Sequence, residues 1–325
     1  MKIALTFDLR QEYLEAGYSA EEAAEFDIPE TINAIETALL ALGHDCLRIG
    51  NARALIRELA AGSSWDMVFN ICEGLRGPGR EALVPALLDD YQIPYTFSDP
   101  LVMAVSLDKA TCKTIIKSLG LQTPEFTVIR NKGDIAKIDL SPPLFAKPLS
   151  EGTSKGISAA SKVLEYSKLK QQCLYLLEKF NQPVLVEKYL PGREFTVGLL
   201  GTAENSRVLG VMEVIMRSAA EESAYSYINK AEYESRVSYR LASDKMAGQC
   251  AELALAAWQG LGCRDAGRVD IRFDERGMAN FLELNPLAGL NPQHSDLAII
   301  CRLSGIPYQD LIGEIVASAE KRIRA

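Results

Sequence analysis

Four side chains near the C-terminal end of the sequence have the types and spacing of a site for metal-bound phosphates. They belong to residues 267–286, GRVDIRFDERGMANFLELNP, in which DERG predicts a tight turn between two strands. Side chains alternate along a strand, so Arg268 and Asp270 share one face of the first strand, and Glu283 and Asn285 share one face of the second. Pairing of the strands would gather the three acceptor side chains beside the arginine. We interpret this cluster as a site for hard divalent cations that bridge phosphates, with a structural salt-bridge network as the alternative.

A lysine followed by a small-residue loop forms a second candidate site. Lys147 ends a predicted strand and precedes the loop 151–157, EGTSKGI. Its ammonium could contact phosphate oxygens, while Gly152 and Gly156 would let backbone N–H groups approach the same oxygens. The loop does not have the Walker A sequence, so an ordinary surface turn is the alternative.

A strand edge followed by a carboxylate forms the third candidate. An apolar strand ends at Glu187, Lys188 and Leu190, and Glu194 begins the next strand. Backbone groups at such an edge can bind the edge of an adenine ring, and a carboxylate further along can accept two ribose hydroxyls. The alternative is a hinge with solvated charges.

The elements that must position these residues fall into three sections. Strand and helix patterns alternate over residues 1 to about 100, which predicts a parallel sheet covered by helices. A small antiparallel α+β unit follows, and residues from about 190 onward combine strands with helices near 243–261 and 296–323. Residues 10–29 interrupt the first strand–helix pair, and we interpret them as a substrate loop or lid, or else as a solvated segment.

Composition excludes several classes of function. The 325 residues carry a net charge of −8, which argues against a nucleic-acid-binding surface. No apolar run approaches the roughly 20 residues that span a bilayer. The seven cysteines include no CxxC pair, so neither a zinc site nor a disulfide framework is indicated, and two histidines are too few for mechanisms built on several. The first residues lack the pattern of a signal peptide, so we expect a cytoplasmic protein without a membrane or nucleic-acid partner.

Five sequence blocks, in this order, resemble those of the D-alanine–D-alanine ligase family of ATP-grasp enzymes. The blocks are SLDK (106–109), AKPLSEGTSKGIS (146–158), EKYLPGREFTV (187–197), GRVDIRFD (267–274) and LELNPLAG (282–289). The resemblance covers nearly the whole chain and implies an α/β ATP-grasp fold. It implies three parts. Residues 1–100 would form an N-terminal parallel-sheet (preATP-grasp) substrate domain, residues 101–188 a central small α+β subdomain, and residues 189–325 a C-terminal α+β catalytic subdomain.

The resemblance also implies a role for each matching residue. Arg268 and Gly289 would stabilise developing negative charge, and Ser295 would bind the carboxylate of the second substrate. Two Mg²⁺ ions, which Mn²⁺ could replace, would be held by Asp270, Glu283 and Asn285. The implied ATP-binding residues are Lys109, Lys147, Thr153, Ser154, Glu187, Lys188, Leu190, Glu194 and Lys230.

The activity implied by the resemblance is an ATP-dependent carboxylate–amine ligation. ATP would convert a carboxylate into an acyl phosphate, which an amine then attacks, so that two amino acids are joined. The resemblance also implies a place in peptidoglycan biosynthesis and a homodimer as one assembly. The alternatives are a ligase for other amino acid or small carboxylate substrates, a small-metabolite kinase and a non-catalytic ATP-binding module.

The substrate half of the sequence departs from the family pattern. The early Gly-Gly loop with its Ser-x-Glu stretch is absent, and Glu25, Asp27 and Glu30 are alternative anchors for the ammonium of the first substrate. The tyrosine expected after Lys230 is replaced by alanine. We hypothesise that Arg76 and Arg80 bind a substrate carboxylate, and that the two amino acids need not both be D-alanine.

Overall fold

The computed structural model describes residues 1–216 and 237–323. The N-terminal section forms a three-stranded parallel sheet of order β2-β1-β3. Strands β1 and β3 are almost entirely buried, as expected for a parallel sheet with helices on both faces. The elements of this section are β1 (Lys2–Phe7), α1 (Arg10–Glu15), α2 (Pro29–Ala41), β2 (Asp45–Gly50), α3 (Ala52–Ala60), β3 (Met67–Ile71), the 3₁₀ turn η1 (Arg80–Ala82) and α4 (Leu83–Asp90).

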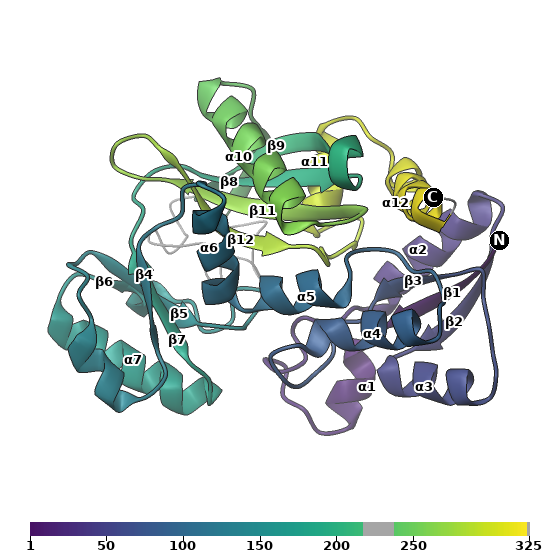
Figure 1. Cartoon of the computed structure of the whole chain (residues 1–325), viewed down its shortest axis with the longest axis horizontal. Coiled ribbons are helices and arrows are strands. Elements are labelled where there is room, and N and C mark those ends of the chain that lie inside the picture. Colours follow the sequence, from purple (N-terminus) through teal and green to yellow (C-terminus); the bar gives the residue numbers. More distant parts are fainter. Residues whose placement is uncertain (217–236, 324–325) are drawn as a thin grey trace.

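The central section is a four-stranded sheet of order β4-β7-β5-β6 with α7 packed against it (Figure 1). Helices α5 and α6 lead into it, and each begins at an aspartate whose side chain accepts hydrogen bonds from the first turn, Asp99 and Asp108. The elements are α5 (Pro100–Leu107), α6 (Lys109–Ser118), β4 (Phe126–Ile129), η2 (Lys132–Lys137), β5 (Leu144–Pro148), η3 (Ala159–Ser161), β6 (Lys162–Val163), α7 (Tyr166–Phe180) and β7 (Val184–Lys188).

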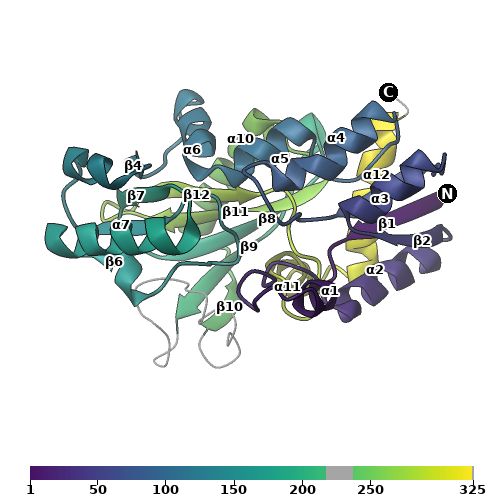
Figure 2. The same cartoon turned by 90° about the horizontal axis from the view of Figure 1, so that it is seen from below.

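The C-terminal section is a five-stranded antiparallel sheet of order β10-β9-β8-β11-β12. Helices α10 and α11 pack against it from opposite sides (Figure 2). The elements are β8 (Glu194–Leu200), η4 (Ala203–Asn205), β9 (Arg207–Met216), β10 (Val237–Leu241), α10 (Lys245–Leu261), β11 (Ala266–Phe273), β12 (Ala279–Asn285), α11 (Asp296–Leu303) and α12 (Tyr308–Ile323).

The last helix returns to the first section and completes its core. Helix α12 packs on α2, and Ile312 and Ile315 join the same buried cluster as Ile3 and Phe69 (Figure 1). Buried Asp265 strengthens this junction, because it accepts the backbone N–H of Phe97 at 2.7 Å and forms an ion pair with Arg322. The N- and C-terminal sections therefore share one hydrophobic core.

Several local predictions from the sequence were wrong. The sequence pattern of IPYTFS (93–98) predicts a short strand, but the structure has a single bridge between Tyr95 and Val68 there. The pattern of residues 156–162 also predicts a strand, but this stretch contains the 3₁₀ turn Ala159–Ser161 instead. The helix expected over 296–323 is two helices, separated around Gly305, whose φ of +73° favours glycine. Within the described ranges, every helix is too short or too polar to span a bilayer.

Gly267 in β11 tests how closely the β11–β12 hairpin packs on Trp258 of α10. A Cβ on Gly267 would lie 2.6 Å from the Asn285 carbonyl oxygen and 2.6 Å from the Trp258 ring. We expect Gly267→Ala to lower the free energy of unfolding by about 1–3 kcal/mol in urea titrations. Gly248 lies inside α10 with nothing within 4 Å of its Cβ position, so Gly248→Ala should raise that energy by about 0.5–1 kcal/mol. Equal stability of the two variants would contradict this packing.

Candidate functional site

The predicted hairpin is confirmed, and it brings the four predicted side chains together. In the β11–β12 pair, Arg268 lies opposite Asn285 and Asp270 lies opposite Glu283. The side-chain amide of Asn285 donates to Asp270 at 3.2 Å, and the Thr196 hydroxyl donates to the other Asp270 oxygen at 2.9 Å. The Arg268 guanidinium is 3.7 Å from the Asp270 carboxylate. The cluster thus combines hard oxygen acceptors with one cation.

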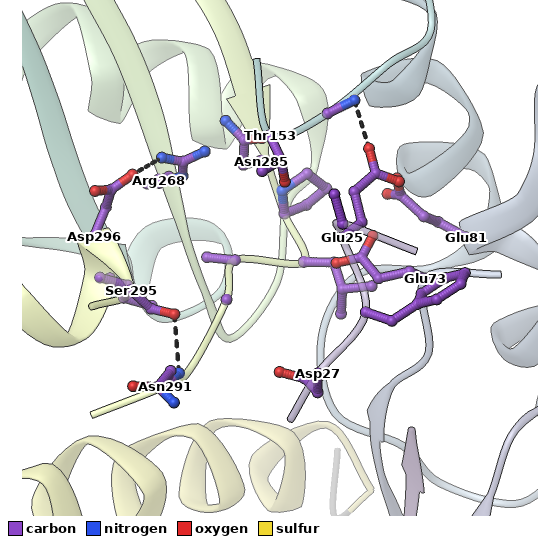
Figure 3. A pocket seen from close by; sticks show the side chains of 18 of the residues that line it. Glu25, Asp27, Glu73, Glu81, Thr153, Arg268, Asn285, Asn291, Ser295 and Asp296 are labelled. Carbon is purple, nitrogen blue, oxygen red and sulfur yellow. Dashed lines mark hydrogen bonds and ion pairs between the residues drawn. The ribbon is translucent and has the colours of Figure 1, made fainter. Parts of the chain in front are cut away.

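Arg268 is oriented by a residue that the sequence analysis did not identify. Its guanidinium forms an ion pair with Asp296 in the first turn of α11, whose side chain is only 3% exposed (Figure 3). Just before this helix, the Ser295 hydroxyl accepts the backbone N–H of Asn291 at 2.9 Å. A Cβ on Gly289 would lie 2.8 Å from that hydroxyl oxygen, so the strand-to-helix connection requires glycine there. Arg268, Gly289 and Ser295 therefore line one wall of a cavity.

A buried carboxylate between two lysines lies on the other side of the hairpin. Glu187 is 2.9 Å from the Lys147 ammonium and 3.0 Å from that of Lys113, and all three side chains are almost fully buried. Burial alone would raise the pKa of Glu187, but the two lysines outweigh it and hold that pKa below its usual value. Lys113 was not identified from the sequence, although it lies one helical turn after Lys109.

The two lysines of this triad have opposite pKa shifts for a geometric reason. Burial lowers the pKa of Lys113 to about 8, because Glu187 only partly compensates it and Lys147 repels it. Burial also acts to lower the pKa of Lys147, but Glu187, Glu283 and Glu194 together raise it above its usual value. Lys147 therefore stays charged and faces the acidic side of the site.

A cavity next to this triad gathers most of the predicted ATP-binding residues. Glu187, Lys188, Leu190 and Glu194 line it, and so do Lys147, Thr153 and Ser154 of the central section. Glu194 is 3.1 Å from Arg272, which also donates to the Tyr189 hydroxyl at 3.2 Å. The rings of Tyr189 and Phe145 stack with their centres 6.4 Å apart. The cavity has an apolar, aromatic end and a charged end.

A second cavity of about 220 Å³ adjoins the first, and Thr153, Arg268 and Glu283 line both. Lys109 lies at this junction: its ammonium is 3.6 Å from Glu283 and donates to the backbone carbonyl of Glu151 at 2.6 Å. Predicted residue Lys230 and the neighbouring Ala231 lie outside the described residues.

The 10–29 segment reaches into the site through its second half. Glu25 accepts the backbone N–H of Gly152 at 2.7 Å and pairs with Arg80 at 3.0 Å and Lys155 at 3.5 Å. Burial would raise the pKa of Glu25, but these cations hold it below its usual value. The Arg80 guanidinium, predicted as a contact for a substrate carboxylate, is paired with Glu25 in this structure, so its role toward a substrate stays a prediction. Arg76 lies on the outer side of this contact, exposed to solvent.

Three further carboxyl groups line the second cavity (Figure 3): Asp27, Glu73 and Glu81. Burial raises the pKa of Asp27 and of Glu81 to about 7. Burial, followed by repulsion from Glu81 and Glu25, raises the pKa of Glu73 well above its usual value. Glu30 is exposed and outside the cavity, so Asp27 is the best placed of the three predicted anchors. Glu73 and Glu81 were not predicted.

The chain is similar to known proteins along nearly its whole length. Residues 115–317 match the family model described as D-ala D-ala ligase C-terminus. The chain is 31% identical over 302 residues to the uncharacterized protein y4sG of Sinorhizobium fredii, covering 89% of this chain and 87% of that protein. It is also 31% identical to the D-alanine–D-alanine ligase of Aquifex aeolicus, covering 95% and 100% of the two chains. The D-alanine–D-alanine ligase of Bacillus anthracis complexed with ATP superimposes with a TM-score of 0.75 at 19% identity, over 100% of this chain and 99% of that one.

The raised pKa of Asp27 predicts a pH-dependent stability. A carboxyl group whose folded pKa is raised stabilises the fold while protonated, and that contribution is lost as pH rises through about 7. Asn mimics the protonated acid at every pH. In the absence of ligands, the free energy of unfolding of Asp27→Asn relative to that of wild type should therefore rise by on the order of 1–3 kcal/mol from pH 5 to pH 8. Urea denaturation at both pH values measures this gain. The exposed control Asp139→Asn should show no comparable gain, and an equal gain in both variants would contradict the assignment.

Proposed function

The chain belongs to the D-alanine–D-alanine ligase family of ATP-dependent ligases, and we propose that it joins two amino acids through an acyl-phosphate intermediate. The observation that carries the proposal is the junction of two cavities at Arg268, Glu283 and Thr153. One cavity has the groups that a nucleotide needs, and the other has the charged groups that amino acids need. Their shared wall is where a γ-phosphate and a substrate carboxylate could meet.

ATP would occupy the first cavity in a single orientation. The stacked rings and the strand end at Lys188 and Leu190 suit the adenine, and Glu194 suits the ribose hydroxyls once it exchanges Arg272 for them. Lys147 and Lys109 then flank the path from the first cavity to the second, where the triphosphate would lie. Thr153 and Ser154 would cover the phosphates.

The residues of the hairpin fit two Mg²⁺ ions bound with the triphosphate. Asp270, Glu283 and Asn285 offer the oxygen donors that this hard cation prefers, provided that the Asn285 amide turns its oxygen toward the ion instead of its NH₂ group. The described residues contain no group of three or more His, Cys, Asp or Glu side chains arranged for a metal, so the amide and the phosphates must complete the coordination. Bound Mg²⁺, or Mn²⁺ in its place, would neutralise phosphate charge.

The proposed chemistry begins with phosphoryl transfer. A carboxylate oxygen of the first amino acid attacks the γ-phosphorus, and the bond to the ADP oxygen breaks. Arg268, held by Asp296, offsets the negative charge that collects at this junction.

The amine of the second amino acid then attacks the acyl carbon, loses a proton, and inorganic phosphate leaves. We assign the carboxylate of this second substrate to Ser295, and the stabilisation of its tetrahedral intermediate to Arg268 and the backbone at Gly289. The contact between Glu25 and the 151–156 loop would keep water away from the acyl phosphate.

Each of the three parts of the chain has a role in this proposal. We propose residues 1–100 as the substrate domain and residues 101–188 and 189–325 as the two halves of the ATP-grasp unit. The family relationship further supports small amino acid or carboxylate substrates, a cytoplasmic location, a homodimer and no nucleic-acid partner.

The proposed metal ligands predict the outcome of a turnover assay. ADP release should require Mg²⁺ and a pair of amino acids, and mass spectrometry should detect a product lighter than the two substrates by one water. Asp270→Asn and Glu283→Gln should each lower kcat by about 100-fold or more, because phosphoryl transfer would lose charge compensation. The exposed control Asp139→Asn should keep wild-type turnover.

Either of two other results would contradict the proposal and indicate a different function. A stable phosphorylated product that accumulates without an amine acceptor would indicate a small-metabolite kinase. Tight ATP binding without turnover for any pair of substrates would indicate a non-catalytic ATP-binding module.

A further inference from the structure

The substrate cavity contains more carboxyl groups than the α-ammonium of one amino acid can pair with. Asp27 comes from the 10–29 segment, Glu73 from the loop after β3, and Glu81 from η1, and all three carboxyl groups line the same cavity (Figure 3). Three separate segments of the chain thus contribute acidic groups to one enclosed space. A single amino acid supplies one α-ammonium group, and its carboxylate adds a negative charge.

Most other acidic groups of the cavity are already paired within the protein. Glu25 is paired with Arg80, and Asp296 is paired with Arg268. Glu283 is 3.6 Å from the Lys109 ammonium and Glu151 is 3.2 Å from that of Lys155. These ion pairs take up the cations that the described part of the chain brings to this region, apart from Arg10, which also lines the cavity.

Glu81 and Glu73 differ from these paired groups. Glu81 is only 9% exposed, lines the cavity, and makes no hydrogen bond or ion pair with another side chain of residues 1–216 and 237–323. Arg80 and Lys109 are the cations that act on it electrostatically, and both have closer partners. Glu73 likewise has no cationic partner within hydrogen-bond distance in the described ranges. At Asp27 the neighbouring Thr31 hydroxyl acts to lower the pKa, but burial outweighs it.

A buried carboxyl group without a partner is costly unless it is protonated or a ligand compensates it. The raised pKa values of Glu73 and Glu81 have that origin, because burial comes first among their causes. A positively charged ligand group placed between them would satisfy both carboxylates and remove the cost. An apolar or neutral side chain in the same position would leave both carboxylates uncompensated.

We infer that one of the two amino acids carries a second positive charge, an ammonium or guanidinium on its side chain, which binds between Glu73 and Glu81. Asp27 then remains for the α-ammonium of that substrate. This inference rests on the proposed ligase function and narrows its substrates to a class.

The experiment compares cationic amino acids with neutral ones of matched length. ADP release is measured with lysine against norleucine and with ornithine against norvaline, in both chiral forms and with every partner amino acid. We expect kcat/KM to be at least about 10-fold higher for the cationic member of the preferred pair, since a charge-assisted contact is worth about that much. Calorimetry with a non-hydrolysable ATP analogue measures binding of the same amino acids without turnover.

Variants assign the preference to the two carboxylates. Glu81→Gln and Glu73→Gln should each reduce the lysine-to-norleucine ratio about 10-fold, while the use of norleucine changes little. The matched control Glu30→Gln changes an exposed carboxylate just after the 10–29 segment. It should leave the lysine-to-norleucine ratio unchanged. If Glu81→Gln does not fold, Glu73→Gln and the wild-type binding comparison still decide the question.

The outcomes separate this inference from the proposed function. Turnover of neutral amino acid pairs with no advantage for cationic ones would overturn the inference and leave the ligase function intact. Absence of turnover with every pair would count against the ligase function, and the calorimetry would then decide the inference alone. Binding of norleucine as tight as that of lysine would overturn it.

Discussion

The burial of Glu187 between Lys113 and Lys147 is the interaction on which the arrangement of the proposed nucleotide site depends. A carboxylate this deeply buried must be compensated, and its two lysines come from different elements, α6 and β5. Lys113 also donates to the backbone carbonyl of Phe281 in β12, which belongs to the C-terminal sheet. The charge requirement of one side chain therefore fixes the central and C-terminal sheets relative to each other. The cavity that we propose for ATP lies between them.

The N-terminal section is joined to this unit by a second set of buried charges. Glu25 contacts the loop that follows β5 and neutralises Arg80 from the loop after β3. Glu25 consequently belongs both to the wall of the second cavity and to the contacts of the 151–156 loop, which we propose to cover the phosphates. A movement of the 10–29 segment would therefore act on the 151–156 loop through the contact of Glu25 with Gly152.

The sequence predicts those parts of the site that depend on local pattern. The β11–β12 hairpin could be recognised because a turn signal and a period of two place Asp270 opposite Glu283 within 20 residues. Asp296 and the pairing of Glu25 with Arg80 could not be recognised, because they depend on contacts between segments far apart in the chain. Glu73 and Glu81 could not be predicted for the same reason. Their loop has a sequence typical of the protein surface, and nothing in it indicates that these side chains line a cavity. The helix break at Gly305 was missed because apolar residues continue on both sides of it.

The position of α12 has a consequence for how the chain is made. Strands β1 and β3 share one buried apolar cluster with Ile312 and Ile315, which follow Ile71 by roughly 240 residues. At a translation rate of about 5–20 residues per second, those partners emerge from the ribosome roughly 10–50 s after the sheet itself. During that interval the part of the N-terminal core that α12 covers in the folded protein lacks its covering helix. The topology therefore leaves apolar side chains of this core uncovered until the end of synthesis, independently of the chemistry at the site.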